Sequence, residues 1–126
     1  MPSVAVPRYR SFRLGLPTGR LADAILSHAP DVVHLASPIA LGATGLRAAR
    51  RLDLPTVGVY QTDVSGFARQ YGVRADVVID RWVGRLHQRM DRTLVPSRRS
   101  QQQLAAVGVT DTHLWRRGVA LDLFDP

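Results

Sequence analysis

Residues 56 to 63 read T-V-G-V-Y-Q-T-D, an apolar, β-branched run that ends in the hydrogen-bonding side chains of Gln61, Thr62 and Asp63. A short continuous run of this kind is typical of a buried strand in a parallel sheet. In open α/β sheets, ligands bind in the crevice outside the carboxyl ends of such strands. We therefore expect a strand here, and we expect its polar end to lie at a functional rim.

The composition predicts one folded domain. The chain has 126 residues, of which 45% are hydrophobic, so a core is expected and wholesale disorder is not. Cysteine is absent, which excludes disulfides, thiolate metal sites and cysteine nucleophiles and agrees with a reducing compartment. The N-terminus lacks the order of a signal peptide, and no apolar run is long enough to span a bilayer. These features predict a cytoplasmic chain.

The charge of the chain is strongly positive, with a formal net charge of +7 and 17 basic residues, all of them arginine. Such an excess prompts a nucleic-acid hypothesis. We discount it, because the arginines are spread along the chain without an aromatic stacking platform and because the absence of lysine is typical of a G+C-rich coding bias. Nucleic acid is not expected as a partner, whereas a local patch is enough for attraction to an anionic membrane surface.

Alternating strand and helix patterns predict an α/β fold. Residues 1 to 16 resemble an irregular lead-in, and Trp82 is expected in the core. Ser97 is expected to cap the last helix, which Gly108 ends. The strand at 31 to 36, the helix after it and the strand at 56 to 63 form a βαβ unit. Helices are predicted at residues 18–28, 41–51, 78–90 and 98–107, and strands at 31–36, 56–63, 93–95 and 112–115.

Catalytic signatures are missing from the sequence. It contains no G-x-G-x-x-G, Walker loop, H-E-x-x-H or G-x-S-x-G pattern. The four histidines are too far apart to match a metal-binding spacing, so no metal is expected. His34 lies in a predicted strand and is either a core histidine with a backbone partner or a residue on one face of the sheet.

Two groups of side chains are candidates for binding. The polar strand end at residues 61 to 63 suits sugar hydroxyls, because an amide donates and accepts hydrogen bonds and a carboxylate accepts them. The alternative is that its last two residues only cap the next helix. The second group is a cationic ridge at i, i+4 spacing, which is either a solvated helix face or a surface for phosphate or anionic lipid. It consists of Arg81, Arg85 and Arg89.

Six segments, taken in order, resemble the N-terminal half of family 4 glycosyltransferases, which are retaining enzymes of the GT-B fold that use nucleotide sugars. They are P-D-V-V-H-L-A-S-P (30–38), L-G-A-T-G-L-R-A-A-R-R-L (41–52), P-T-V-G-V-Y-Q-T-D (55–63), A-D-V-V-I-D-R-W (75–82), D-R-T-L-V-P-S (91–97) and R-G-V-A-L-D-L-F-D-P (117–126). The form Y-Q-T-D-V-x-G-F-A-R-x-Y-G at 60 to 72 is most similar to actinobacterial GDP-mannose-dependent α-mannosyltransferases of glycolipid synthesis.

The resemblance implies a Rossmann-like parallel sheet with flanking helices, as the incomplete N-terminal, acceptor-side domain of a GT-B fold. This domain is expected over residues 1–126, ending at the interdomain linker near 117–126, with the C-terminal donor-binding domain absent. The intact enzyme is expected to transfer mannose from GDP-mannose to a lipid or glycolipid acceptor with retention, without a metal or other cofactor. The chain alone is expected to be inactive. The alternative is a non-catalytic α/β binding module.

The resemblance also assigns roles to single residues. Many relatives carry histidine where Gln61 stands, although the mannosyltransferase subgroup resembles this sequence in having glutamine. Glutamine cannot shuttle a proton, so Gln61 is expected to position the sugar and no catalytic residue is assigned. Thr62 and Asp63 are expected to support the acceptor pocket and Arg117 to line the cleft, although its motif reads R-G-V-A where the family has N/R-G-V-D. The arginine ridge is expected to face the inner surface of the cell membrane.

Overall fold

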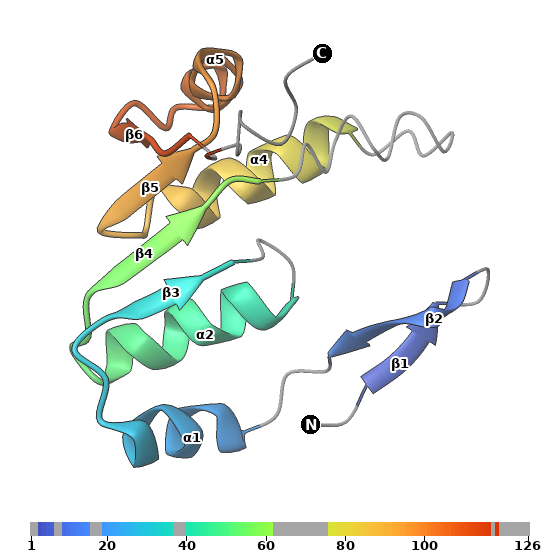
Figure 1. Ribbon diagram of the computed structural model, residues 1–126, viewed down its shortest axis with the longest axis vertical. Helices are drawn as coiled ribbons and strands as arrows, with labels where there is room; N and C mark the ends of the chain where they lie inside the picture. Colours follow the sequence, from blue (N-terminus) through green and yellow to red (C-terminus); the bar gives the residue numbers. More distant parts are fainter. Residues whose placement is uncertain are drawn as a thin grey trace.

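The fold contains a four-stranded parallel sheet with helices and, before it in the chain, a two-stranded antiparallel hairpin (Figure 1). The computed structural model describes residues 3–6, 9–15, 19–36, 40–61, 76–116 and 118. The predicted Rossmann-like α/β class is confirmed. The elements are β1 (Ser3–Val6), β2 (Tyr9–Gly15), α1 (Arg20–His28), β3 (Val33–Leu35), α2 (Ala40–Arg51), β4 (Thr56–Val59), α4 (Asp76–His87), β5 (Arg92–Val95), α5 (Arg98–Ala106) and β6 (Thr112–Leu114).

The parallel sheet has the strand order β3-β4-β5-β6. Leu35 pairs with Gly58 across β3 and β4, and Leu94 pairs with Val59 on one side and with His113 on the other. The predicted βαβ unit is therefore present, with α2 as the crossover between β3 and β4. Because all four strands run in the same direction, their carboxyl ends meet at one edge of the sheet.

The helices α2, α4 and α5 pack against one face of this sheet. Leu104 of α5 and Val83 of α4 form a buried cluster with Val95 of β5. Leu35 of β3 packs against α2 and α4 in a second cluster. A side chain on Gly58 of β4 would collide with the sulfur of Met90, so the glycine allows the end of α4 to approach the strand closely.

The amino edge of the sheet is closed by a pair of side chains. Asp91 Oδ2 accepts hydrogen bonds from the backbone nitrogen of Thr56 at 2.8 Å and from its hydroxyl at 2.7 Å. The backbone nitrogen of Asp91 in turn donates to the Thr56 hydroxyl at 3.2 Å. These hydrogen bonds lower the pKa of the Asp91 carboxyl, and the bond from the Thr56 hydroxyl has the largest effect. The start of β4 is thus tied to the residue that precedes β5.

The predicted end of α5 is confirmed by its capping groups. The hydroxyl of Ser97 accepts from the backbone nitrogen of Ser100 at 3.1 Å, which satisfies one of the free N–H groups of the first turn. Gly108 follows the helix with φ at 85°, a conformation that favours glycine.

Four expectations differ from the structure. Residues 3–6 and 9–15, which were predicted as part of an irregular lead-in, pair instead as the antiparallel hairpin of β1 and β2. The strand that begins at Thr56 ends at Val59, so Gln61 lies two residues beyond the strand, whereas residues 62 and 63 lie outside the described residues. The helix predicted to reach residue 90 ends at His87. Trp82 is not in the core, since 41% of its surface is exposed.

Candidate functional site

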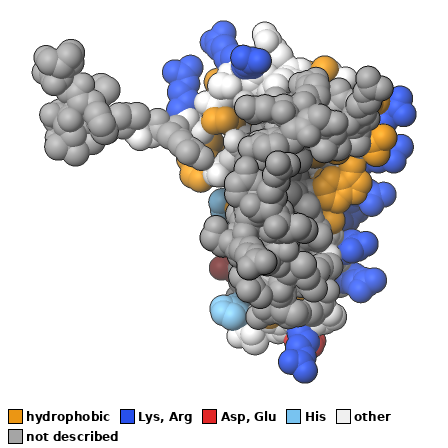
Figure 2. All heavy atoms as spheres, turned by 90° about the vertical axis from the view of Figure 1, so that its right-hand side faces the viewer, with side chains coloured by type: hydrophobic (Ala, Val, Ile, Leu, Met, Phe, Trp, Pro, Cys, Tyr) orange, Lys and Arg blue, Asp and Glu red, His pale blue; other side chains and the backbone are white. Residues whose placement is uncertain are grey.

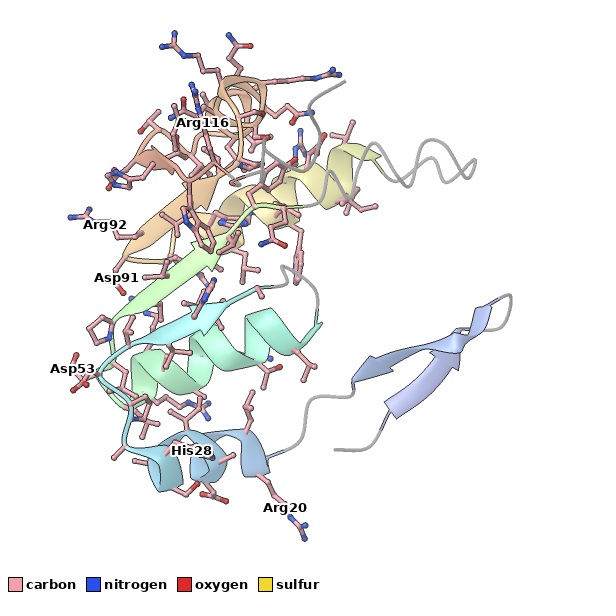
Figure 3. All side chains as sticks on the ribbon, viewed as in Figure 1. Arg20, His28, Asp53, Asp91, Arg92 and Arg116 are labelled. Atoms are coloured by element: carbon pink, nitrogen blue, oxygen red, sulfur yellow. The ribbon has the colours of Figure 1, made fainter. Side chains whose placement is uncertain are left out.

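A pocket of about 390 Å³ lies at the carboxyl edge of the sheet. Figure 3 shows Arg116 beyond the arrowheads of the strands, whereas Asp53, Asp91 and Arg92 lie at the opposite edge. The described residues that line this pocket carry aliphatic, aromatic, amide and guanidinium groups. They are Val59, Gln61, Pro96, Trp115, Arg116 and Gly118.

The position of these side chains follows from hydrogen bonds that continue the parallel pairing past the strand ends. The backbone nitrogen of Tyr60 donates to the Leu94 carbonyl at 2.9 Å, which holds the chain on the sheet until Gln61. The backbone nitrogen of Trp115 donates to the Val95 carbonyl at 2.8 Å. Gln61 and Trp115 are therefore delivered to the same rim from two different strands, as expected for the carboxyl edge of an α/β sheet.

The pocket offers binding groups and no proton-transfer group among its described lining residues. The side chains of Gln61 and Arg116 are exposed, and no hydrogen bond connects the Gln61 amide to another described residue. A primary amide donates and accepts hydrogen bonds, while a guanidinium only donates. The arrangement suits the recognition of hydroxyl groups or of a phosphate, and it does not supply a general acid or base.

The indole of Trp115 forms the aromatic wall of the pocket, and 50% of the surface of this residue is exposed. Its ring meets that of His34 on β3 edge to face, with centroids 6.2 Å apart and planes inclined at 60°. His34 is thus not a core histidine with a backbone partner. It is exposed on one face of the sheet, which was the second of the two interpretations.

Only one of the predicted sugar-binding residues can be placed in this pocket. Gln61 lies where the sequence predicted it, whereas Thr62, Asp63 and Arg117 lie outside the described residues. Sequence reasoning missed Trp115. The signal was available, because the rule that directed attention to the end of the strand at 56 to 63 applies equally to the strand predicted at 112 to 115.

The predicted arginine ridge is divided between two hollows. Arg81 and Arg85 lie exposed on α4 and line a cavity of about 480 Å³ between this helix and the end of α5. Arg89 lies in the turn after α4 and lines a separate cavity of about 550 Å³ at the amino edge of the sheet. There its backbone carbonyl accepts a hydrogen bond from Arg50 at 3.5 Å.

A buried histidine of α4 lies beneath the sheet, away from the pocket. His87 is 2% exposed, and its Nδ1 is 3.2 Å from the hydroxyl of Thr93. Its ring meets that of Tyr60 edge to face at 5.9 Å, and its Nε2 has no hydrogen-bond partner in the described part of the chain. Burial lowers the pKa of His87 to about 4, so the imidazole is neutral at pH 7.

The described residues contain neither a metal-binding cluster nor a membrane-spanning helix. Among them, no group of three or more histidine, cysteine or acidic side chains is arranged to hold a metal ion. No helix in the same part of the chain has the length and apolar character needed to cross a bilayer.

Comparison with known proteins gives the family. The chain is 47% and 46% identical to the GDP-mannose-dependent alpha-mannosyltransferases of Mycobacterium tuberculosis and Mycolicibacterium smegmatis, over 100% of its own length and 34% of theirs. It is 36% identical to the protein of that name from Corynebacterium glutamicum, over 100% of the chain and 31% of the relative. The chain thus spans about a third of the length of these relatives. No solved structure matches it significantly. The sequence model named Glycosyltransferase Family 4 matches residues 1–123, and the chain belongs to this family.

Proposed function

We propose that this chain forms the acceptor side of the active-site cleft of a GDP-mannose-dependent α-mannosyltransferase. The observation that carries the proposal is the pocket at the carboxyl edge of the sheet, lined by Gln61 in a chain of glycosyltransferase family 4. The relatives that match over the whole chain carry this activity in their names. Donor-binding groups are proposed to lie outside these 126 residues, because the chain corresponds to about a third of each relative.

In this proposal the pocket binds and orients, and it moves no proton. The Gln61 amide holds sugar hydroxyls at the rim, because it can donate and accept at the same time. The exposed guanidinium of Arg116 adds hydrogen-bond donors to the same pocket. Thr62 and Asp63 are proposed to support the acceptor, and Arg117 to line the cleft. Transfer with retention then requires the groups that stabilise the leaving nucleotide, so the chain alone has no transferase activity.

The acceptor is proposed to be a lipid or glycolipid presented at the inner face of the cell membrane. Support comes from the outward face of α4, where Val77, Val78 and Trp82 are 57%, 69% and 41% exposed. Arg81 and Arg85 lie exposed among them. Apolar side chains beside arginines suit a membrane interface with anionic lipid. Figure 2 shows hydrophobic side chains beside a row of basic ones along one side of the molecule.

A chimera tests the proposed activity. The matching 127-residue segment of the Mycobacterium tuberculosis relative is replaced by this chain, and transfer of radiolabelled mannose from GDP-mannose to a membrane glycolipid fraction is measured. We expect the chimera to be active and the chain alone to be inactive. We expect Gln61→Ala to lower kcat/KM of the chimera about 10- to 100-fold, because this variant loses one or two hydrogen bonds that strengthen in the transition state.

The control is Gln102→Ala, which removes an exposed glutamine of α5 that does not line the pocket and is expected to leave kcat/KM unchanged. A folded chimera without transferase activity would overturn the proposed function and favour a non-catalytic binding module. Turnover of GDP-mannose by the 126-residue chain alone would overturn the assignment of the donor site to another part of the enzyme.

A further inference from the structure

The pocket at the carboxyl edge has a single described aromatic wall, Trp115. Half of the surface of this residue is exposed although it is among the largest apolar side chains of the chain. It lines the same pocket as Gln61 and Arg116. A large flat ring that forms a pocket wall and remains open to solvent provides contact area for a ligand.

Trp115 is held through one main-chain hydrogen bond and one ring contact before any ligand binds. The backbone nitrogen of Trp115 is tied to the Val95 carbonyl at 2.8 Å. The ring of His34 meets the indole edge to face at 6.2 Å. His34 lies on β3, and β3 pairs with β4, the strand that leads to Gln61. An aromatic ring fixed in this way loses little conformational freedom when a ligand covers it.

The chemistry of the lining favours a particular class of ligand. A pyranose ring has an apolar face of C–H groups and a rim of hydroxyls, so it matches a flat aromatic surface that has an amide and a guanidinium beside it. The described lining holds no carboxylate. It also has no second parallel aromatic face of the kind that sandwiches a nucleobase, because His34 meets the indole at 60°.

We propose that Trp115 is the stacking platform for a pyranose ring in this pocket, and that His34 is the residue that positions the platform. The sugar packs its C–H face on the indole and directs its hydroxyls to the Gln61 amide. This inference rests on the proposed function, which brings a sugar to this edge of the sheet. It adds a specificity-determining residue from a second strand of the sheet.

Fluorescence of the full chain tests the platform directly. The chain contains two tryptophans, and Trp82→Phe leaves Trp115 as the only one. Titration with methyl α-D-mannopyranoside up to about 50 mM is expected to change the Trp115 emission with saturation, at a dissociation constant in the millimolar range. In this background, Gln61→Ala is expected to weaken binding about five-fold through the lost hydrogen bond.

His34 is tested by substitution and rescue. His34→Ala is expected to weaken mannoside binding about three-fold and to shift the emission of Trp115 in the free protein, because the ring that orients the indole is lost. His34→Phe, which keeps an aromatic edge, is expected to restore the affinity. His113→Ala is the matched control, since His113 is also exposed and lies on β6, three strands away from β3 in the sheet.

The outcomes separate this inference from the proposed function. A saturable response that the His34 and Gln61 variants weaken supports the platform. A Trp115 emission that stays constant up to about 50 mM mannoside overturns it, and so does a response to GMP that is stronger than the response to the mannoside. An active chimera together with a silent Trp115 overturns the platform alone. An inactive chimera together with mannoside binding at Trp115 overturns the proposed function alone.

Discussion

The two faces of α4 carry similar apolar side chains but place them in opposite surroundings. The inward face buries Val83, Leu86 and His87, whose exposed fractions are 5%, 8% and 2%. The outward face exposes Val78 and Trp82, at 69% and 41%. An amphipathic helix usually turns its apolar residues to the core and its charges to water. In α4 the outward face is apolar as well as basic, and this is the feature on which the proposed membrane surface rests.

The largest expected effect concerns the histidine on the inward face. The pKa of His87 is about 4 in the folded chain and 6.5 for an ordinary histidine, so the unfolded chain takes up a proton that the folded chain refuses. The contribution of the neutral His87 to the free energy of unfolding is therefore fully present above about pH 6.5. It is lost as the pH drops towards 4, by roughly 3 kcal/mol in total. Urea unfolding from pH 4 to 7 measures this loss.

The variant His87→Leu isolates this contribution. The side chains that contact His87 from neighbouring strands, Tyr60 and Thr93, carry no charge, so burial of the imidazole accounts for its lowered pKa. We expect His87→Leu to remove most of the pH dependence between 4 and 6.5, and the exposed-site control His113→Gln to keep it. A variant that retains the full pH dependence would show that another group takes up the proton.

A matched pair of valines gives the next largest effect. Val83→Ala removes two buried carbons and is expected to lower the free energy of unfolding by about 1.5 to 2 kcal/mol, after a small gain in helix propensity. Val78→Ala removes the same carbons from an exposed position, so we expect a change within about 0.5 kcal/mol. Denaturant unfolding of both variants provides the measurement. Equal losses would mean that the outward face is covered within the folded chain.

The smallest expected effect concerns the outward face and vesicle binding. The double variant Arg81→Gln/Arg85→Gln is expected to leave stability unchanged, and Trp82→Ala is expected to lower the free energy of unfolding by about 1 kcal/mol, because the part of Trp82 that is not exposed loses its contacts. Each is expected to weaken binding to phosphatidylglycerol vesicles about 5- to 30-fold, because each arginine near an anionic surface contributes about 1 kcal/mol and an interfacial tryptophan contributes a similar amount. Cosedimentation at low salt measures the binding.

The control for this experiment is Arg98→Gln/Arg99→Gln, which removes two exposed arginines of α5 and the same net charge. A membrane surface on α4 predicts that this control loses less affinity than the α4 variant. If both double variants lose the same affinity, the attraction depends on net charge alone. If none of the variants changes the affinity, α4 makes no contact with the vesicles. Either result would show that α4 is not the contact surface.

The sequence was sufficient for most of the fold. All four strands of the parallel sheet were predicted, the first two of them from β-branched runs, and Ser97 and Gly108 marked the ends of α5 because their capping chemistry is local. The hairpin at residues 3 to 15 was missed because the prolines in this segment favoured an irregular interpretation.

Side-chain environment was harder to predict than secondary structure. Trp82 was assigned to the core because it follows Val78 at i+4, yet the buried side chains of α4 are those of Val83, Leu86 and His87, at i, i+3 and i+4. Two apolar stripes at helical spacing fit the same helix, and only the tertiary packing selects the inward one. The position of Gln61 could be predicted because this residue directly follows a predicted strand. The contact between Trp115 and His34 could not be predicted, because it joins residues far apart in the sequence and hydrophobic periodicity reports only local structure.

The hydrogen bond between Thr56 and Asp91 fixes the register of β4 and β5 at the amino edge of the sheet. It joins the starts of two strands that are each four residues long, so the strands leave a common line and end on a common line. A slip of one residue in β5 would break the bond at one edge and displace Pro96 from the pocket at the other. The number of residues in each strand therefore sets the distance from the Thr56–Asp91 bond to the pocket, so a hydroxyl at one edge of the sheet fixes the position of the proposed sugar-binding pocket at the other.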